Sequence, residues 1–342
     1  MYSAVQKIIH LAKHSMLVMA KPRLLPKIAE GYFKALVLKR PVLRTIEVAI
    51  TPECNTLCEM CYASRLKKKD QPILRLDEYR NVWAQAKKLG AFSVIISGGE
   101  PTFRPDFLEV VKCFEPGWSL VAVVSNGIET EKHLKGMAEV GVRTLHLSLD
   151  STTPAIHDRI RRHEGNFSKT MSAIAAAKKL GFNTYISSVI CHGGLEKMAE
   201  MVEFARREEI GIVFSLACPT GEKAGKKEYV LTPDEWAIVK RVMAENPHIR
   251  ADWTINLSGR EVTGCGMNFI SFGNIREEPL AVIWRRMQKF PPFAARSENC
   301  LIGADHEYID KYLLPLSGHD ELPVRIHDHP TSPISFSELD DE

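Results

Sequence analysis

Short hydrophobic runs alternate with amphipathic segments along the chain from residue 45 onward. The hydrophobic runs are rich in β-branched residues and have the length of buried strands. The segments between them carry apolar residues every three to four positions, which is the period of an α-helix. Alternating strands and helices are typical of a parallel sheet built from β-α-β units. We therefore predict an α/β fold.

Six strands and five helices follow from this pattern. The predicted strands are residues 45–50, 93–97, 120–125, 144–149, 184–190 and 212–216. The predicted helices are residues 76–89, 105–113, 131–140, 167–180 and 195–207. Periodicity alone does not separate an open doubly wound sheet from a barrel. A dinucleotide-binding fold is disfavoured, because no G-x-G-x-x-G sequence follows the first strand.

Composition places the chain among ordinary globular proteins. It has 342 residues, of which 45% are hydrophobic and 25% charged, enough for one barrel with extensions. The net charge of +3 is small and the basic residues form no stripe with aromatic residues, so nucleic-acid binding is not expected. No run approaches the length of about eighteen apolar residues that a membrane-spanning helix needs.

The segment before residue 45 is strongly basic. Its only acidic residue is Glu30, whereas its basic residues are Lys7, Lys13, Lys21, Arg23, Lys27, Lys34, Lys39, Arg40 and Arg44. Apolar residues are mixed among them, which predicts a basic amphipathic helical extension over residues 1–44. One hypothesis is peripheral contact with an anionic membrane. The alternative is a helix packed against the barrel with its lysines in water.

Three cysteines, Cys54, Cys58 and Cys61, follow the first predicted strand on one short loop. Three thiolates can hold a four-iron cluster and leave one iron open to another ligand. A structural zinc site is the alternative, but it requires four ligands and the chain has no second short-spaced pair. A disulfide is disfavoured because three cysteines leave one unpaired. The chain opens with no signal peptide, so we expect a cytoplasmic location.

Polar residues and glycines also occupy the ends of the next three predicted strands. They are Gly98, Gly99 and Glu100, then Ser125 and Asn126, then Ser148 and Asp150. Loops at the carboxyl ends of parallel strands collect the chemistry of such sheets. Glycine lets the backbone approach a ligand closely, although each of these sequences is also compatible with an ordinary turn.

The cysteine loop, followed by Ser97-Gly98-Gly99-Glu100-Pro101 at the end of the next strand, resembles the radical S-adenosylmethionine (SAM) superfamily. The resemblance implies a partial (β/α)6 TIM-like barrel over residues 45–245 and a small irregular extension over residues 246–342. It implies a [4Fe-4S] cluster on the three cysteines, with SAM on the open iron. It also implies an electron donor such as flavodoxin or ferredoxin.

In that family, reductive cleavage of SAM gives a 5′-deoxyadenosyl radical that abstracts hydrogen from a substrate or adds to it. The substrate implied here is an unidentified peptide, cofactor precursor or lipid-like molecule. A different class of function stays open from the residues alone. That class is a non-catalytic iron–sulfur or metal-binding protein with a redox-sensing or binding role.

The resemblance also implies roles for single residues. The turn at Gly98, Gly99 and Glu100 would bind the amino group of SAM. Met60 stands where many members place an aromatic residue beside the adenine, and Tyr62 would take over that packing. The ribose and methionyl parts would be held by polar residues at the later strand ends, namely Ser125, Asn126, Ser148 and Asp150. Arg161 would pair with the SAM carboxylate, unless it is a solvated surface arginine.

The C-terminal third resembles a shortened twitch or SPASM-type extension. The resemblance rests on Gly264-Cys265-Gly266, on residues 272–280 and on Asn299-Cys300. Such extensions bind auxiliary iron–sulfur clusters, but the hairpin that carries a further cysteine is absent from this sequence. The candidate ligands are Cys218, Cys265 and Cys300, and ordinary buried cysteines are the alternative.

Overall fold

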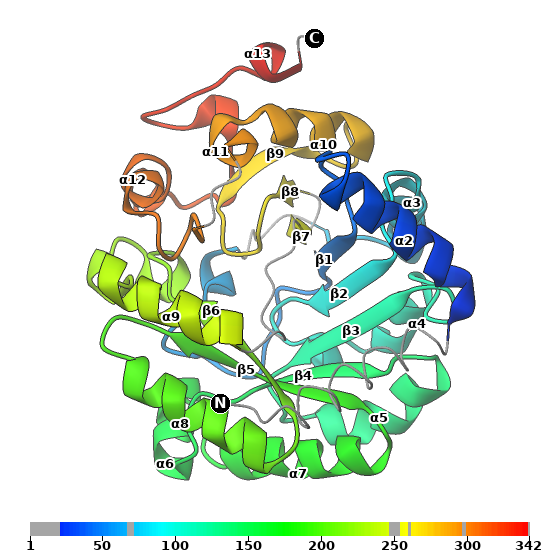
Figure 1. Cartoon of the computed structure of the whole chain (residues 1–342), viewed down its shortest axis with the longest axis vertical. Coiled ribbons are helices and arrows are strands. Elements are labelled where there is room, and N and C mark those ends of the chain that lie inside the picture. Colours follow the sequence, from blue (N-terminus) through cyan, green and yellow to red (C-terminus); the bar gives the residue numbers. More distant parts are fainter. Residues whose placement is uncertain (1–20, 67–71, 246–253, 259–260, 296–298, 341–342) are drawn as a thin grey trace.

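A computed structural model describes residues 21–66, 72–245, 254–258, 261–295 and 299–340. Its described strands form one curled sheet with the order β10-β9-β8-β7-β1-β2-β3-β4-β5-β6 (Figure 1). The first six strands are parallel and are β1 (Thr45–Ala49), β2 (Ser93–Ser97), β3 (Leu120–Ser125), β4 (Thr144–Ser148), β5 (Asn183–Ile190) and β6 (Gly211–Leu216). The predicted six-stranded partial barrel is confirmed.

Helices cover the outer face of these six strands (Figure 1). They are α3 (Leu76–Lys88), α4 (Phe107–Lys112), α5 (Thr130–Glu139), α6 (Pro154–Arg161), α7 (Asn166–Lys179) and α8 (Leu195–Arg207). The sequence pattern predicts five of them; α6, which is only eight residues long, was not predicted.

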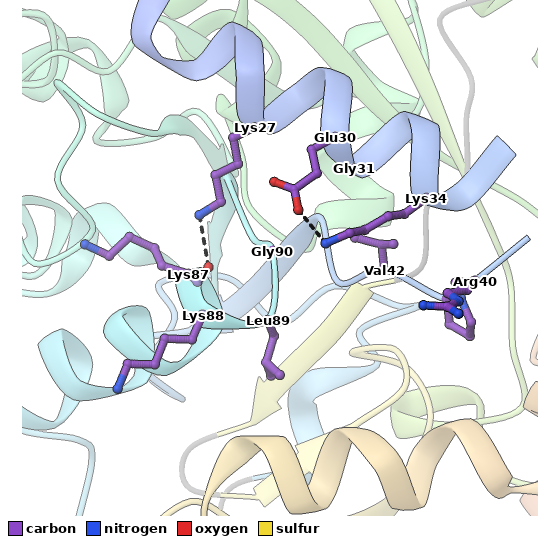
Figure 2. Close-up of a pocket in the computed structure, with 11 residues that line it drawn as sticks. Lys27, Glu30, Gly31, Lys34, Arg40, Val42, Lys87, Lys88, Leu89 and Gly90 are labelled. Carbon is purple, nitrogen blue, oxygen red and sulfur yellow. Dashed lines mark hydrogen bonds and ion pairs between the residues drawn. The ribbon is translucent and has the colours of Figure 1, made fainter. Parts of the chain in front are cut away.

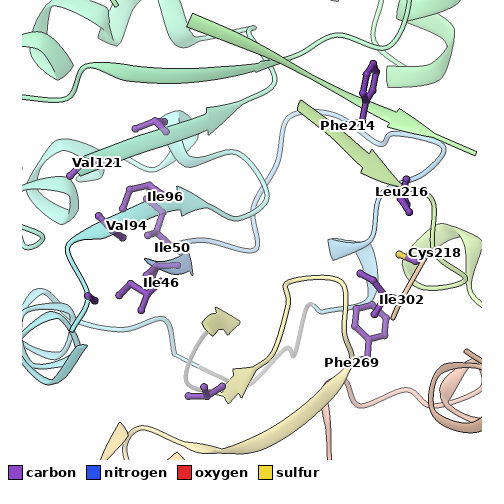
Figure 3. Close-up of a cluster of buried hydrophobic side chains, with 14 of the residues drawn as sticks. Ile46, Ile50, Val94, Ile96, Val121, Phe214, Leu216, Cys218, Phe269 and Ile302 are labelled. Carbon is purple, nitrogen blue, oxygen red and sulfur yellow. The ribbon is translucent and has the colours of Figure 1, made fainter. Parts of the chain in front are cut away.

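The two faces of the strands differ in burial. On β1, Ile46 and Val48 are fully buried, whereas Glu47 and Ala49, each of which follows one of them, are only half-buried. The same alternation runs through β2, β3 and β4. Since the helices bury the outer face, the half-buried residues line the inside of the barrel. The interior is therefore partly open, and Figure 3 shows side chains of the buried layer.

The N-terminal helix α2 (Leu25–Leu36) lies across the amino ends of the first strands. The Lys21 ammonium donates a hydrogen bond to the carbonyl of Ser119, just before β3, at 2.6 Å. The Lys27 ammonium donates to the carbonyl of Lys87, at the end of α3, at 3.0 Å (Figure 2). The basic helix thus packs on the end of the barrel opposite the cysteine loop. The predicted residues 1–20 of this extension lie outside the described residues.

The C-terminal segment continues the same sheet. After α9 (Pro233–Glu245), β7 (Thr254–Ser258) pairs in parallel with β1, and β8 (Glu261–Thr263), β9 (Ile270–Asn274) and β10 (Val324–Arg325) extend it. The helices of this segment are α10 (Leu280–Lys289), α11 (Pro291–Ala294), α12 (His306–Tyr308) and α13 (Phe336–Asp340). The sequence pattern did not predict these four strands. The division at residues 44 and 245 stays a prediction.

An aromatic cluster forms the core of this segment. Phe290 is fully buried, and its ring centroid lies 5.0 Å from those of Phe272 and Phe293 and 5.3 Å from that of Tyr312. Among the helices described, none has both the length and the apolar character needed to cross a membrane.

Candidate functional site

The loop after β1 carries Cys54, Cys58 and Cys61 at the carboxyl end of the barrel. The Thr56 hydroxyl lies 3.2 Å from the Cys54 Sγ and 3.3 Å from the Cys58 Sγ, so one hydroxyl bridges two of the three thiols. Burial raises the pKa of Cys54, and burial with the nearby Cys58 raises the pKa of Cys61 to about 11. In the cofactor-free protein these two thiols are protonated at neutral pH, and binding iron would release their protons.

Gly98 and Gly99 pack the end of β2 directly on the cysteine loop. Gly98 has a φ of +146°, and a Cβ there would lie 2.5 Å from the Thr51 carbonyl oxygen. A Cβ on Gly99 would lie 2.1 Å from the Glu53 carbonyl oxygen. Instead, the Gly99 N–H donates to the Thr51 carbonyl at 2.7 Å, and the Glu100 N–H donates to the Glu53 carbonyl at 2.8 Å. Only glycines allow this approach, because any side chain would separate the two segments.

The Glu100 side chain is fully buried and joins the end of β2 to the end of β3. Its carboxylate accepts hydrogen bonds from the Thr102 N–H at 3.0 Å and the Thr102 hydroxyl at 2.5 Å. It also accepts from the Ser125 hydroxyl at 2.8 Å and the Asn126 N–H at 2.7 Å. Burial raises the pKa of Glu100 despite these bonds. The Glu100 side chain is fully buried and bonded to the protein, whereas the backbone of Gly98 and Gly99 is half-exposed, so the glycine backbone is the part of the turn that a ligand can reach.

Asn126 fixes the cysteine loop from the third strand. Its side-chain amide donates to the Asn55 Oδ1 at 2.7 Å and lies 3.9 Å from the Cys54 Sγ. Its backbone carbonyl accepts bonds from the Asn166 Nδ2 at 3.0 Å and the Thr170 hydroxyl at 3.2 Å, both on α7. The ends of β2 and β3 and the cysteine loop thus form one hydrogen-bonded unit.

An ion pair between Asp150 and Arg161 lies beside Cys58. The Arg161 Nη2 is 2.5 Å from the Asp150 Oδ2, and the Arg161 Nη1 is 3.8 Å from the Cys58 Sγ. Both charged side chains are buried, so the alternative of a solvated surface arginine is wrong. Among the described residues, nothing accepts a hydrogen bond from the buried Arg161 Nε. The pair therefore presents a buried cation with an unused donor next to the cysteine loop.

Asp150 is held by groups that the sequence analysis did not identify. The Val189 N–H donates to the Asp150 Oδ1 at 2.9 Å, and the Lys197 Nζ lies 3.6 Å from that oxygen. The Asp150 N–H donates to the His157 Nδ1 at 3.2 Å. Burial alone would raise the pKa of Asp150, but the charges of Arg161 and Lys197 outweigh it and lower that pKa. Lys197 and His157 lie on α8 and α6, so only the packing of helices on the sheet reveals them.

The other predicted SAM contacts, Met60, Tyr62 and Ser148, are half-buried at the same end of the barrel. Burial raises the pKa of Tyr62 well above its ordinary value, as does the charge of nearby Glu47. Glu47 accepts a hydrogen bond from the Ser97 hydroxyl at 2.8 Å on the inner wall of the barrel. Tyr62 therefore faces the barrel interior, and its packing against adenine stays a prediction.

The arrangement of these residues fits an iron–sulfur cluster with a small polar ligand beside it. In the described ranges, no group of three or more His, Cys, Asp or Glu side chains is gathered for a single metal ion. The cysteines of a four-iron cluster each bind a different iron, so they stand farther apart than the ligands of one ion. The three loop thiols can each bind a different iron. The half-exposed glycine backbone and the unused Arg161 donor are available to a polar ligand beside the cluster.

The structure also brings Cys218, Cys265 and Cys300 together, although they come from distant segments. Burial raises the pKa of Cys218 to about 12 and that of Cys265 still further, and the charge of Cys300 contributes to both. The three cysteines therefore lie within range of one another's charge, with Cys218 buried and Cys265 and Cys300 half-buried. Figure 3 shows Cys218 beside Ile302 and Phe269, which belong to the same cluster of buried hydrophobic side chains.

The fold and the site together define a partial β/α barrel with a three-cysteine loop at the carboxyl ends of its strands. Residues 48–207 match the family model described as the Radical SAM superfamily. Residues 48–207 are thus a region of this superfamily, whose cofactors are a [4Fe-4S] cluster and SAM. The resemblance inferred from the cysteine loop and the Gly-Gly-Glu turn is thus confirmed.

Curated relatives of the chain are enzymes. The GTP 3′,8-cyclase of Limosilactobacillus fermentum is 26% identical over 208 residues, which are 57% of this chain and 61% of that protein. The AdoMet-dependent heme synthase of Methanosarcina barkeri is 28% identical over 171 residues, which are 50% of this chain and 48% of that protein. The chain thus spans about half to three fifths of the length of these relatives. Because this coverage is partial, these relatives support the superfamily, and the activity of the whole protein is a proposal.

A solved structure has the same fold. The crystal structure of Streptococcus suis SuiB bound to precursor peptide SuiA has a TM-score of 0.57 at 13% identity, over 75% of this chain and 67% of that chain. SuiB has also been solved bound to S-adenosylmethionine.

Proposed function

We propose that this chain binds a [4Fe-4S] cluster through Cys54, Cys58 and Cys61 and reductively cleaves SAM. When bound, the cluster and SAM together supply a 5′-deoxyadenosyl radical that abstracts hydrogen from, or adds to, a substrate in the barrel. The observation that carries this proposal is the close packing of the Gly98 and Gly99 turn on the cysteine loop. It places three thiols beside the open ends of the strands.

Different residues of the site would bind the cluster and the separate parts of SAM. The three cysteines hold the cluster, and Thr56 and Asn126 keep the loop in place. The backbone of the Gly-Gly turn would bind the amino group of SAM, because it is half-exposed, whereas the Glu100 side chain is fully buried and bonded to the protein. The remaining polar strand-end residues, Ser125, Ser148 and Asp150, would orient the ribose and methionyl parts.

Arg161 would bind the carboxylate of SAM. Its unused Nε–H is a buried donor, and a guanidinium suits a planar carboxylate. The test is SAM affinity of the reconstituted Arg161→Ala protein, which we expect to fall at least about tenfold for the loss of a charged hydrogen bond. Arg159→Ala is the matched control, because Arg159 is exposed on the same helix. Unchanged affinity in Arg161→Ala would sink the assignment.

The central experiment separates catalysis from a merely cluster-binding role. The protein is reconstituted anaerobically, reduced and incubated with SAM, and 5′-deoxyadenosine is measured by chromatography. We expect product from the wild type and none from Cys58→Ala. A wild type that binds iron but yields no product above this variant would favour the non-catalytic iron–sulfur protein.

An auxiliary cluster on Cys218, Cys265 and Cys300 is a separate proposal. It is supported by the convergence of three cysteines, of which Cys218 is buried and Cys265 and Cys300 are half-buried, on one hydrophobic cluster. Iron counting on anaerobic protein tests it, because about four irons per chain means one cubane and about eight means two. The Cys265→Ala variant should return the count from about eight to about four, with the Cys54 loop intact.

Substrate, partners and location complete the proposal. A cofactor precursor is supported by the heme synthase among the curated relatives, whereas a peptide or lipid-like substrate has no support beyond the sequence resemblance. The reductant would be a flavodoxin or ferredoxin in the cytoplasm. Incubation with SAM and candidate substrates in deuterated form, followed by mass spectrometry of 5′-deoxyadenosine, identifies the hydrogen donor.

A further inference from the structure

An apolar ridge runs along the solvent-facing side of α2. Leu25, Ala29 and Phe33 on α2, and Val37 at its C-cap in helical conformation, follow one another at four-residue intervals, which places them in one row. All four are exposed, and the exposed fractions of Phe33 and Val37 are 54% and 62%. The next residue, Leu38, is also exposed. A helix on a globular surface usually turns polar residues to water, so this ridge lacks a partner within the described chain.

A basic pocket lies on the neighbouring side of the same helix (Figure 2). It has a volume of about 310 Å³, and it is lined by charged and uncharged residues of α2, of the end of α3 and of the linker between α2 and β1. The cations are Lys27, Lys34, Arg40, Lys87 and Lys88, and the acid is Glu30. Lys34 is paired with Glu30, and Lys87 is paired with Glu115 at 2.6 Å. Even with both carboxylates counted, the cations exceed them by three.

The positive charge of the surface formed by the ridge and the pocket favours an anionic partner. A second copy of the chain would bring two basic surfaces together, which like-charge repulsion opposes. An anionic phospholipid bilayer matches both features, because its interface accepts apolar side chains and its headgroups carry phosphate. The pocket volume lies at the lower end of the range of about 300–1,000 Å³ that is typical of small-molecule sites.

We propose that α2 docks this protein on an anionic bilayer, with the apolar ridge in the interface and a headgroup phosphate in the basic pocket. The proposal does not rest on the proposed enzymatic function. Because α2 covers the amino ends of β1 to β3, docking leaves the cysteine loop on the side away from the bilayer. The barrel mouth would then stay open to water-borne substrates and electron donors.

Vesicle co-sedimentation of the full chain tests the proposal. Vesicles of phosphatidylglycerol mixed with phosphatidylcholine are compared with vesicles of phosphatidylcholine alone, at low and at high salt. We expect binding to the anionic vesicles that weakens as salt rises, since surface charges are screened. Binding to the neutral vesicles should be much weaker.

Two double variants separate the ridge from the pocket. Phe33→Ser with Val37→Ser should weaken binding at least about tenfold, because apolar area leaves the interface. Arg40→Gln with Lys88→Gln should weaken it by about fivefold per cation. These side chains are exposed or at the surface, so the variants should fold, as circular dichroism can check.

Matched controls carry the same changes elsewhere. Ile156→Ser with Leu180→Ser changes two side chains whose exposed fraction is 41%, on the far side of the barrel. Lys169→Gln with Lys179→Gln removes two exposed cations from α7. Both controls should bind as the wild type does. Equal weakening in the controls would overturn the assignment to α2.

Other outcomes also decide the matter. The proposal fails if vesicles of both compositions bind equally or not at all. It fails if inorganic phosphate binds in a calorimetric titration, dependent on Arg40 and Lys88, while no vesicle does, since the pocket would then serve a soluble phosphate. It fails if ultracentrifugation shows a dimer that the Phe33→Ser and Val37→Ser variant dissociates. The proposal also fails if deletion of residues 1–20 abolishes vesicle binding while the Phe33→Ser and Val37→Ser variant binds as the wild type does. The membrane contact would then lie in residues 1–20 and not on α2.

Discussion

Replacing Asp150 with asparagine removes the negative partner of Arg161 while keeping nearly the same shape. The asparagine can still accept the hydrogen bond from the Val189 N–H. It leaves the buried Arg161 guanidinium with no carboxylate among the contacts that the structure describes, and with the Cys58 thiol at 3.8 Å. The perturbation is therefore mainly electrostatic.

The expected cost follows from the burial of the pair. Asp150 is fully buried and the exposed fraction of the Arg161 side chain is 10%, so water cannot replace the lost charge. Breaking such a pair by removing one partner costs about 3–5 kcal/mol. Lys197 lies 3.6 Å from Asp150, and the loss of this carboxylate partner adds in the same direction. We expect the free energy of unfolding to fall by about 3 kcal/mol or more.

The pH dependence gives an independent check. The folded protein lowers the pKa of Asp150, whereas an unfolded aspartate titrates near pH 3.9, as an approximate reference. The carboxylate therefore stabilises the wild type fully above about pH 4, and this contribution is lost as pH falls through the lower folded pKa. The stability difference between wild type and Asp150→Asn should stay level from about pH 5 to 7 and shrink below about pH 4.

Urea unfolding of the cofactor-free protein under reducing conditions measures both effects. Glu109→Gln is the control, because the Lys112–Glu109 pair is exposed and should contribute far less. The double variant Asp150→Asn with Arg161→Met should be more stable than the sum of the single changes predicts. The reasoning is refuted if Asp150→Asn costs no more than the control, or if the two changes are additive.

Three further predictions concern other parts of the chain. Gly99→Ala should release the cysteine loop and abolish iron binding, because its Cβ would lie 2.1 Å from the Glu53 carbonyl oxygen. Gly117→Ala is the control and should bind iron as the wild type does, because no atom lies within 4 Å of the added Cβ. Phe290→Ala should cost about 3–5 kcal/mol in urea unfolding, and Phe290→Leu clearly less; equal costs would contradict a tightly packed aromatic cluster. The Cys218 thiol, whose pKa is about 12, should resist iodoacetamide at pH 8 in the folded cofactor-free protein and react after unfolding, and rapid labelling of the folded protein would disprove its burial.

The barrel strands were predictable because their signal is local. Runs such as residues 93–97 and 120–125 are apolar and β-branched, and the predicted bounds differ from the observed strands by at most one residue. The later strands were missed for a physical reason. β8 is only three residues long, and β7 is a strand because it pairs with β1, about two hundred residues earlier.

In the site, too, some residues could be predicted from local sequence and others could not. The three cysteines stand close in sequence and the glycine turn ends the next strand, and these two motifs in this order indicate the cluster without any knowledge of the fold. The partners of Arg161 come from elsewhere: Asp150 ends a strand and Lys197 lies on a helix. Their charges act together only because the barrel brings these elements to one edge. The sequence could name Arg161 and Asp150 separately but could not show that they form a pair.

The sequence by itself determined the class of the protein and the position of its cofactor loop. Both follow from short motifs, the cysteine loop and the Gly-Gly-Glu turn, that can be recognised without the fold. Only the tertiary structure decided that Gly99 packs on the cysteine loop, that Glu100 is buried and bonded to the end of β3, and that Cys218, Cys265 and Cys300 lie in one region. It also decided that the basic N-terminal segment lies across the amino ends of the barrel with an apolar ridge in water. These features depend on contacts between residues far apart in the chain, and no local pattern specifies which face of a helix stays uncovered once the rest of the protein has packed.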